Sequence, residues 1–323
     1  MVIKGRGSGE LADLIDGAQA GQARSVAKLI SLVEDNSAQL RTAMRLLLPF
    51  SGRGHVVGIT GSPGVGKSTT TSAIISCLRA RGQRVGVLAI DPSSPFSGGA
   101  LLGDRIRMQE HAVDPEVFIR SMATRGHLGG LSWATPQAIR VLDAAGCDVI
   151  LIETVGVGQS EIEVVGVADT VLVLVAPGMG DSVQAAKAGI LEIGDIFVVN
   201  KADRDGAPAA CRELRHMISL GSREPGAWRP PVLKTVAATG TGIAEVLVEI
   251  DKHHEWARQS GALRRRRMAR AADEIEAIAV AAMRARMGQL GGDHRVSALA
   301  EQVVDRALDP YTAADVLLAG LRG

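Results

Sequence analysis

Short apolar runs alternate with helix-like segments through the middle of the chain. Each run is rich in Val, Ile or Leu at successive positions, a pattern typical of parallel strands that are covered on both faces. The runs occupy residues 55–60, 84–90, 117–121, 148–153, 170–175, 195–200 and 232–237. Because helical segments separate them, the pattern predicts βαβ units and an α/β fold with a doubly wound, mostly parallel sheet.

The two ends of the chain have a helical pattern instead. Residues 1–49 place apolar side chains at steps of three and four residues, and residues 258–323 read as helical again. We therefore expect an N-terminal helical arm at 1–49, a central α/β domain at 50–257 and a C-terminal helical arm at 258–323. One face of the C-terminal arm is apolar and consists of Ile275, Ile278, Ala279, Ala282, Met283 and Met287. Such a face suits a dimer interface and suits packing on the central domain equally well.

Composition and charge narrow the function. Hydrophobic residues make up 46% of the chain and aromatic residues only 2%, so aliphatic side chains must build the core. The 36 basic and 35 acidic residues nearly cancel, which gives no general attraction to nucleic acid or to an anionic membrane. The cysteines are far apart and form no CxxC pair, which fits a reducing compartment. With no signal-peptide core and no apolar run of membrane-spanning length, we expect a soluble cytoplasmic protein.

Residues 61–68 read GSPGVGKS, which fits the G-x-x-x-x-G-K-[ST] pattern of a phosphate-binding loop. A predicted strand precedes this stretch and a helical segment follows it, as the motif requires. Glycines let consecutive backbone N–H groups turn toward phosphate oxygens, and the helix N-terminus adds partial positive charge. Lys67 is expected to reach the β- and γ-phosphates, and the Ser68 hydroxyl to ligate Mg²⁺. The predicted nucleotide contacts are Gly61, Ser62, Pro63, Gly64, Val65, Gly66, Lys67, Ser68 and Thr69.

Residues 200–203 read NKAD and come directly after a predicted strand. The Asp203 carboxylate can accept two hydrogen bonds from guanine, whereas adenine lacks the exocyclic amine and leaves the carboxylate unpaired. Asn200 is expected to help hold the base and its loop, and the Lys201 stem to cover the face of the base. A further loop follows the last predicted strand, where a backbone N–H could meet the guanine oxygen, and it contains Ala237, Ala238 and Thr239. The predicted ligand is therefore GTP or GDP.

Two acidic residues, Asp91 and Glu153, stand at the ends of predicted strands. Ligands of doubly wound sheets bind at this edge, so one of the two acids should support Mg²⁺, directly or through water. Glu153 stands where many GTPases have Asp, and its longer side chain could contact a metal-bound water or orient the attacking one. Gly156 is expected to give a backbone N–H to the γ-phosphate. Asp104, in a glycine-rich stretch, is either a metal-shell or switch residue or a helix N-cap.

The residue after Gly156 is Val157, where Ras-like enzymes carry the glutamine that positions water. Gln159 lies two residues further on and could substitute for it. We therefore hypothesise slow intrinsic hydrolysis that a partner accelerates.

Five stretches, GSPGVGKST, DPSSPFSGGALLGDR, ETVGVGQSE, APGMGDSVQAAKAGI and NKAD, occur in this order and resemble the MeaB/ArgK GTPases. The resemblance spans roughly residues 10–320. It implies a SIMIBI-like P-loop GTPase fold, Mg²⁺-dependent hydrolysis of GTP to GDP and phosphate, and a homodimer joined through C-terminal helices. It also implies a chaperone that gates adenosylcobalamin loading of methylmalonyl-CoA mutase and protects that enzyme from inactivation.

Carried onto this sequence, the resemblance implies that Lys67 and Ser68 hold phosphates and metal. It places Asp91 and Asp104 in the Mg²⁺ and switch region, and makes Glu153 the catalytic or metal-linked acid. The catalytic candidates are thus Glu153, Lys67 and Asp104, and the metal candidates are Ser68, Asp91, Asp104 and Glu153.

Residues 178–187 match a further switch loop of the same family. In it, Asp181 and Lys187 are candidates for a rearrangement that a partner triggers. The alternative is an ordinary helix start, in which Asp181 is an N-cap and Lys187 a solvated helix residue.

Three other functions compete with the GTPase chaperone. A metal-delivery GTPase needs a Cys/His cluster near the nucleotide, and the sequence has none. A phosphotransferase needs a base for an acceptor hydroxyl, which the sequence does not identify. A targeting GTPase of the signal-recognition type normally carries a helical domain that binds RNA or membrane, and the neutral charge of this chain disfavours it.

A run of arginines could suggest nucleic-acid binding and a pair of histidines could suggest metal binding, but we favour neither function. Four consecutive arginines at 264–267 lack interleaved aromatic residues and are followed by acidic ones, so a solvated helix surface or a partner contact is expected. Adjacent His253 and His254 point in different directions on a helix, so they are expected to be ordinary surface residues, not metal ligands.

Overall fold

The computed structural model describes residues 6–92, 108–124, 134–154, 164–178, 190–221, 224 and 226–319. The chain divides into two compact units, Met1–Leu263 and Arg264–Gly323. Among the described helices, none combines the length and the apolar character that crossing a membrane requires.

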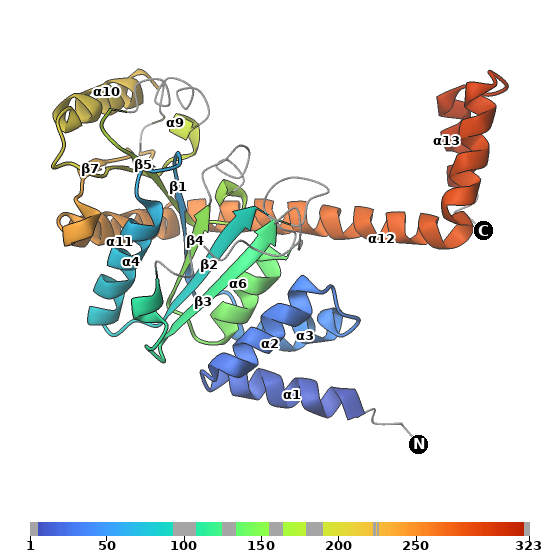
Figure 1. Cartoon of the computed structure of the whole chain (residues 1–323), viewed down its shortest axis with the longest axis horizontal. Coiled ribbons are helices and arrows are strands. Elements are labelled where there is room, and N and C mark those ends of the chain that lie inside the picture. Colours follow the sequence, from blue (N-terminus) through green and yellow to red (C-terminus); the bar gives the residue numbers. More distant parts are fainter. Residues whose placement is uncertain are drawn as a thin grey trace. The chain divides into compact units, whose positions relative to one another are not determined.

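A seven-stranded sheet forms the centre of the first unit, with its strands in the order β3-β2-β4-β1-β5-β6-β7 (Figure 1). Every pairing between neighbouring strands of this sheet is parallel. Each apolar run of the sequence contributes one strand, so the prediction of a doubly wound, mostly parallel sheet is confirmed. The strands are β1 (His55–Thr60), β2 (Val85–Pro92), β3 (Val117–Thr124), β4 (Val149–Thr154), β5 (Thr170–Val175), β6 (Ile196–Val199) and β7 (Val232–Lys234).

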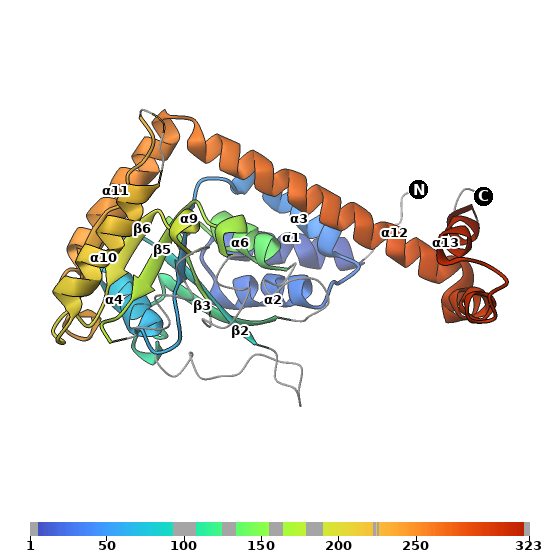
Figure 2. The same ribbon diagram turned by 90° about the horizontal axis from the view of Figure 1, so that it is seen from above.

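Helices cover both faces of the sheet, and α4 and α6 lie on opposite sides of it (Figures 1 and 2). Successive strand residues serve the two sides in turn: Val56 packs in one buried cluster and Val57 in the other. Both faces are therefore apolar, which explains the unbroken runs in the sequence. The helices that follow strands are α4 (Lys67–Ala80), α6 (Thr135–Ala144), α9 (Ile190–Ile193), α10 (Ala207–Leu220) and α11 (Ile243–Gln259). The short 3-10 turns are η1 (Leu48–Phe50), η2 (Gln109–His111), η3 (Val164–Gly166) and η4 (Ala237–Thr239).

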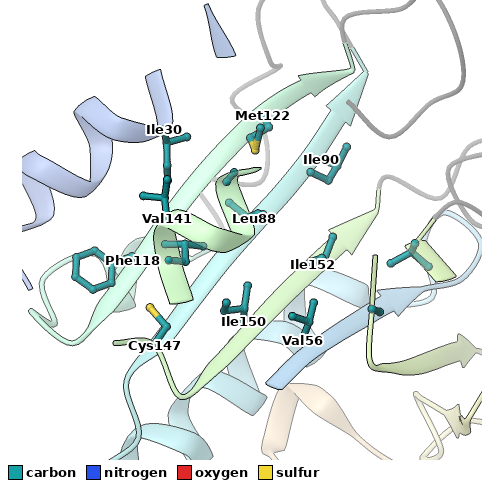
Figure 3. Close-up of a cluster of buried hydrophobic side chains, with 14 of the residues drawn as sticks. Ile30, Val56, Leu88, Ile90, Phe118, Met122, Val141, Cys147, Ile150 and Ile152 are labelled. Carbon is teal, nitrogen blue, oxygen red and sulfur yellow. The ribbon is translucent and has the colours of Figure 1, made fainter. Parts of the chain in front are cut away.

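The N-terminal helices pack on the α6 side of the sheet. They are α1 (Arg6–Gln19), α2 (Ala23–Glu34) and α3 (Leu40–Leu47). Figure 3 shows Ile30 of α2 in one cluster with Phe118 of β3 and Val141 of α6. Arg120 of β3 adds polar contacts to α2, since it donates a hydrogen bond to Ser31 Oγ at 3.1 Å and pairs with Glu34. The N-terminal helices thus share a core with the sheet.

The second unit consists of helix α12 (Ala262–Val304), whose first residues belong to the first unit, and helix α13 (Pro310–Ala319). The apolar face predicted for this part of the chain is largely solvent-accessible, because Ile275 is 68% and Met283 is 57% exposed. Ile278 is exposed as well, whereas the side chain of Met287 lies outside the described residues. Exposed apolar side chains repeated along one helix are typical of a surface that a partner covers.

The three cysteines, Cys77, Cys147 and Cys211, carry free thiols. Cys147 is buried just before β4, and burial raises the pKa of its thiol to about 12. It therefore stays protonated and poorly nucleophilic near neutral pH.

A buried polar network crosses the amino-terminal edge of the sheet. The hydroxyl of Thr170 lies 2.8 Å from both His55 Nε2 and His253 Nδ1, and His253 Nε2 lies 3.2 Å from Asp195 Oδ1. The indole N–H of Trp228 donates to the Asp195 carbonyl at 2.7 Å. These contacts join β1, β5 and α11 on the edge opposite the phosphate-binding loop.

The interpretation of His253 as a surface residue is wrong, because its side chain is fully buried in this network. His253 lies three residues after Ile250 and four before Ala257, so it continues the buried stripe of α11. His254 is half-buried, and its ring stacks on His55 with centroids 4.0 Å apart.

We predict that Thr170→Val lowers the free energy of unfolding by about 1–3 kcal/mol, because it leaves two buried histidine nitrogens without their shared partner. Thr170→Ser keeps the hydroxyl and should recover most of this loss. Urea denaturation of the three proteins measures the difference. Equal stability of the Val variant and the parent chain would contradict this role of the network.

Candidate functional site

The loop between β1 and α4 has the backbone that phosphate binding requires. Gly61, Gly64 and Gly66 all have positive φ, at +137°, +80° and +95°. A Cβ at residue 61 would lie 2.2 Å from the Leu174 carbonyl oxygen, and one at residue 66 would lie 2.4 Å from Asn200 Nδ2. These two positions therefore require glycine for space as well as for conformation. Pro63 and Gly64 are exposed at the tip of the loop, whereas Val65 packs in the core.

Lys67 and Ser68 open helix α4, directly after the loop. The buried ammonium of Lys67 donates to the carbonyls of Gly61 at 2.7 Å and Ser62 at 3.2 Å. Its charge is therefore held over the loop, where the helix N-terminus adds partial positive charge. Thr69, the next residue, is exposed.

Ser68 and Glu153 meet at the carboxyl end of β4. The Ser68 hydroxyl donates to Glu153 Oε1 at 2.6 Å, and only 2% of the Glu153 side chain is exposed. The pairing of β2 with β4 places Ala89 opposite Glu153, so Asp91, the penultimate residue of β2, lies at the same edge. The side chain of Asp91 lies outside the described residues. Hydroxyl and carboxylate oxygens are the ligands that Mg²⁺ prefers, so this edge fits the predicted metal.

Asn200, which follows β6, connects the phosphate-binding loop to the loop after β7. Its Nδ2 donates to the Val65 carbonyl at 2.9 Å. Its Oδ1 accepts hydrogen bonds from the Thr235 hydroxyl at 3.1 Å and from the Ala237 N–H at 3.0 Å. The amide is almost fully buried, so one side chain fixes two loops to each other.

Lys201 and Asp203 lie on the solvent side of the same edge. Lys201 adopts a left-handed backbone with φ +55°, and its ammonium donates to the Gly64 carbonyl at 2.6 Å. Asp203 is exposed and open to a ligand. Ala238 and Thr239, in the turn η4, are exposed as well. The structure thus brings 61–68, 200–203 and 237–239 together at one edge of the sheet.

Several predicted residues lie outside the described part of the chain. They are Asp104, Gly156, Gln159, Asp181 and Lys187. Among the residues that are described, no group of three or more His, Cys, Asp or Glu side chains could hold a metal ion.

The sequence interpretation missed Thr235, whose hydroxyl binds the Asn200 amide. The missed signal is a polar residue that directly follows the last strand, two positions before the predicted ligand residues 237–239. It also missed the hydrogen bond of Lys201 to Gly64, because 137 residues separate the two positions.

Comparisons with known proteins identify the family of the chain. The sequence model of one family, described as "Methylmalonyl Co-A mutase-associated GTPase MeaB", matches residues 26–290. A Pyrococcus horikoshii protein named as a GTPase is 48% identical over 313 residues, 96% of this chain and 98% of its own length. The Escherichia coli protein "GTPase ArgK" is 38% identical over 247 residues, 73% of each chain. The solved structure titled "Crystal structure of LAO/AO transport system kinase" is similar with a TM-score of 0.69 and 26% identity, covering 100% of both chains.

We predict that Gly61→Ala and Gly64→Ala differ sharply, although both glycines have positive φ. Gly64 faces open space, so its substitution costs only the strain of a left-handed alanine, about 1–2 kcal/mol. Gly61→Ala adds a clash with the Leu174 backbone and should cost clearly more. Thermal and urea unfolding of the two variants without nucleotide measures both effects. Equal losses in the two variants would contradict the close approach at residue 61.

Proposed function

Because the chain belongs to the MeaB family of GTPases, we propose that it is a chaperone of an adenosylcobalamin-dependent methylmalonyl-CoA mutase. In this proposal, binding and hydrolysis of GTP gate the loading of adenosylcobalamin and protect the mutase from inactivation. The observation that carries it is the family match over residues 26–290, since the family description itself names association with the mutase. The free thiols support a reducing compartment, and we place the protein in the cytoplasm.

The phosphate end of the nucleotide binds the loop 61–68. Backbone N–H groups of the loop and the N-terminus of α4 face the phosphates, and Lys67 balances the charge on the β- and γ-phosphates. Ser68 and Glu153 would hold Mg²⁺, with Asp91 at the neighbouring strand end. Bound there, the metal would offset the negative charge that the phosphates carry during hydrolysis.

Glu153 is the acid that we assign to the hydrolysis step. Its carboxylate lies within one hydrogen bond of Ser68, on the strand that leads to Gly156. In this position it orients water beside the γ-phosphate, and Asp104 and Gly156 are included in the proposed site through their sequence motifs. The Val at 157 leaves intrinsic hydrolysis slow, and the partner accelerates it.

The base end of the nucleotide binds residues 200–203 and 237–239. Asp203 accepts hydrogen bonds from guanine, and the stem of Lys201 covers the base. Asn200 keeps the loop of Ala237 next to the phosphate-binding loop, so one nucleotide can contact both. The support for this assignment is the exposed carboxylate of Asp203 beside a rigid, buried Asn200.

The C-terminal arm, residues 258–323, is the proposed dimerisation arm. Its exposed apolar side chains, Ile275, Ile278 and Met283 on α12, lie at helical spacing on one long helix. A second copy of the chain would bury them.

We predict that Asp203→Asn weakens GTP binding by about 100-fold or more, because the amide cannot accept both hydrogen bonds from guanine. The matched control is Asp205→Asn, which removes the same charge two residues away at an exposed position. Fluorescence titration with labelled GTP and ATP analogues measures both variants. A similar loss in the two variants would contradict a specific contact with the base.

The function as a whole is tested by binding to purified methylmalonyl-CoA mutase. We expect a complex whose affinity differs between GDP and a non-hydrolysable GTP analogue, and we expect Lys67→Ala to lose that difference. Capture of binding partners from native extract, with the GTP analogue present, tests the alternative functions. Recovery of a nickel enzyme would favour metal delivery, and release of a phosphorylated acceptor in place of inorganic phosphate would favour a phosphotransferase. Either result, without the mutase, would overturn the proposal.

A further inference from the structure

Two buried threonines face each other where β1 and β4 end. Thr60 is fully buried and Thr154 is 1% exposed. The Thr154 hydroxyl donates to Thr60 Oγ1 at 3.2 Å and lies 3.5 Å from the Ile59 carbonyl. Thr60 is the last residue before the phosphate-binding loop, and Thr154 directly follows Glu153.

The register of the sheet shows what this contact joins. Ile59 of β1 lies opposite Glu153 of β4, and Ile90 of β2 lies opposite Thr154. Thr154 therefore sits between the strand that enters the phosphate-binding loop and the strand that carries Asp91 one residue further on.

Two consecutive residues of β4 form hydrogen bonds at the two ends of the phosphate-binding loop. Side chains alternate along a strand, so Glu153 and Thr154 point to opposite faces of the sheet. Glu153 accepts a hydrogen bond from Ser68, the last residue of the loop 61–68, while Thr154 donates one to Thr60, the residue before the loop. The loop is thus fastened to β4 at its entry and at its exit.

Burial alone does not explain these hydroxyls. Valine has nearly the same shape as threonine and would fill the same space without the cost of desolvating a polar group. Ile152, the preceding residue on the same face of β4, is apolar, and so is Ile59, which precedes Thr60 on β1. A pair of hydroxyls at the carboxyl ends of β1 and β4, next to the phosphate-binding loop, indicates a role in positioning these strand ends.

We propose that Thr154 is a positioning residue for GTP hydrolysis. Through Thr60 it holds the end of β4, and with it the carboxylate of Glu153, at a fixed distance from the phosphate-binding loop. The inference rests on the role proposed above for Glu153. It adds that the hydroxyl of Thr154 acts on the rate of hydrolysis and not on the affinity for GTP, because Thr154 itself faces away from the nucleotide contacts of Ser68.

The test compares Thr154→Val with Thr154→Ser in single-turnover and steady-state GTP hydrolysis. T154V should lower kcat about three- to tenfold, the effect of one hydrogen bond, and change KM for GTP less than about twofold. T154S keeps the hydroxyl and should return kcat to within about twofold of the parent chain. T60V should reproduce the loss, and the double variant T60V/T154V should be no slower than either single variant, since all three lack the same bond.

The matched control is Thr170→Val, which removes a buried hydroxyl at the opposite edge of the sheet. It should destabilise the protein and leave kcat unchanged below its unfolding temperature. Equal effects of T154V and T170V on kcat, or a change in KM alone for T154V, would overturn the inference. Glu153→Gln distinguishes the proposed role of Glu153 from that of Thr154. This variant should lower kcat about 100-fold or more. If E153Q hydrolyses GTP normally, the assignment of Glu153 fails, whereas loss in E153Q without loss in T154V refutes only the role of Thr154.

Discussion

The amide of Asn200 is the contact on which the site depends. A loop built on glycines with positive φ has no secondary structure of its own, so other parts of the chain must hold its shape. Asn200 supplies one hydrogen bond to the Val65 carbonyl and accepts two from the loop after β7. Each of these groups is buried, so losing the amide would leave several unsatisfied polar atoms. The loop of residues 61–68 and the loop after β7 are therefore held to each other by one side chain.

The sheet makes this arrangement possible because all its strands point the same way. The polar and charged side chains of the candidate site lie at the carboxyl ends of the strands. There β4 lies between β1 and β2, and Ser68 contacts Glu153. The opposite edge carries a different polar system, centred on Thr170 and His253. Burial of both faces under helices keeps the strands rigid between these two edges, so small displacements at one hydrogen bond affect the geometry of its neighbours.

Local patterns predicted most of the fold, because a strand that is buried on both faces requires apolar residues at consecutive positions. The phosphate-binding loop was predictable for the same reason: its glycines, lysine and serine must be adjacent in sequence. The order of the strands was not, since no local pattern states which strand neighbours which. The contact of Asn200 with Val65 spans 135 residues, and that of Thr154 with Thr60 spans 94, so both needed the folded chain. His253 was misread because a polar residue in a buried stripe looks like a surface residue until its partners are known.

We propose that one guanine nucleotide spans the edge from the phosphate-binding loop to Asp203. Titration calorimetry of the intact chain with Mg²⁺, comparing non-hydrolysable analogues of GTP and ATP, tests it most directly. We expect measurable heat and tight binding for the GTP analogue, with the ATP analogue weaker by about 100-fold or more. Equal affinity for the two analogues, or no heat with the GTP analogue, would contradict it.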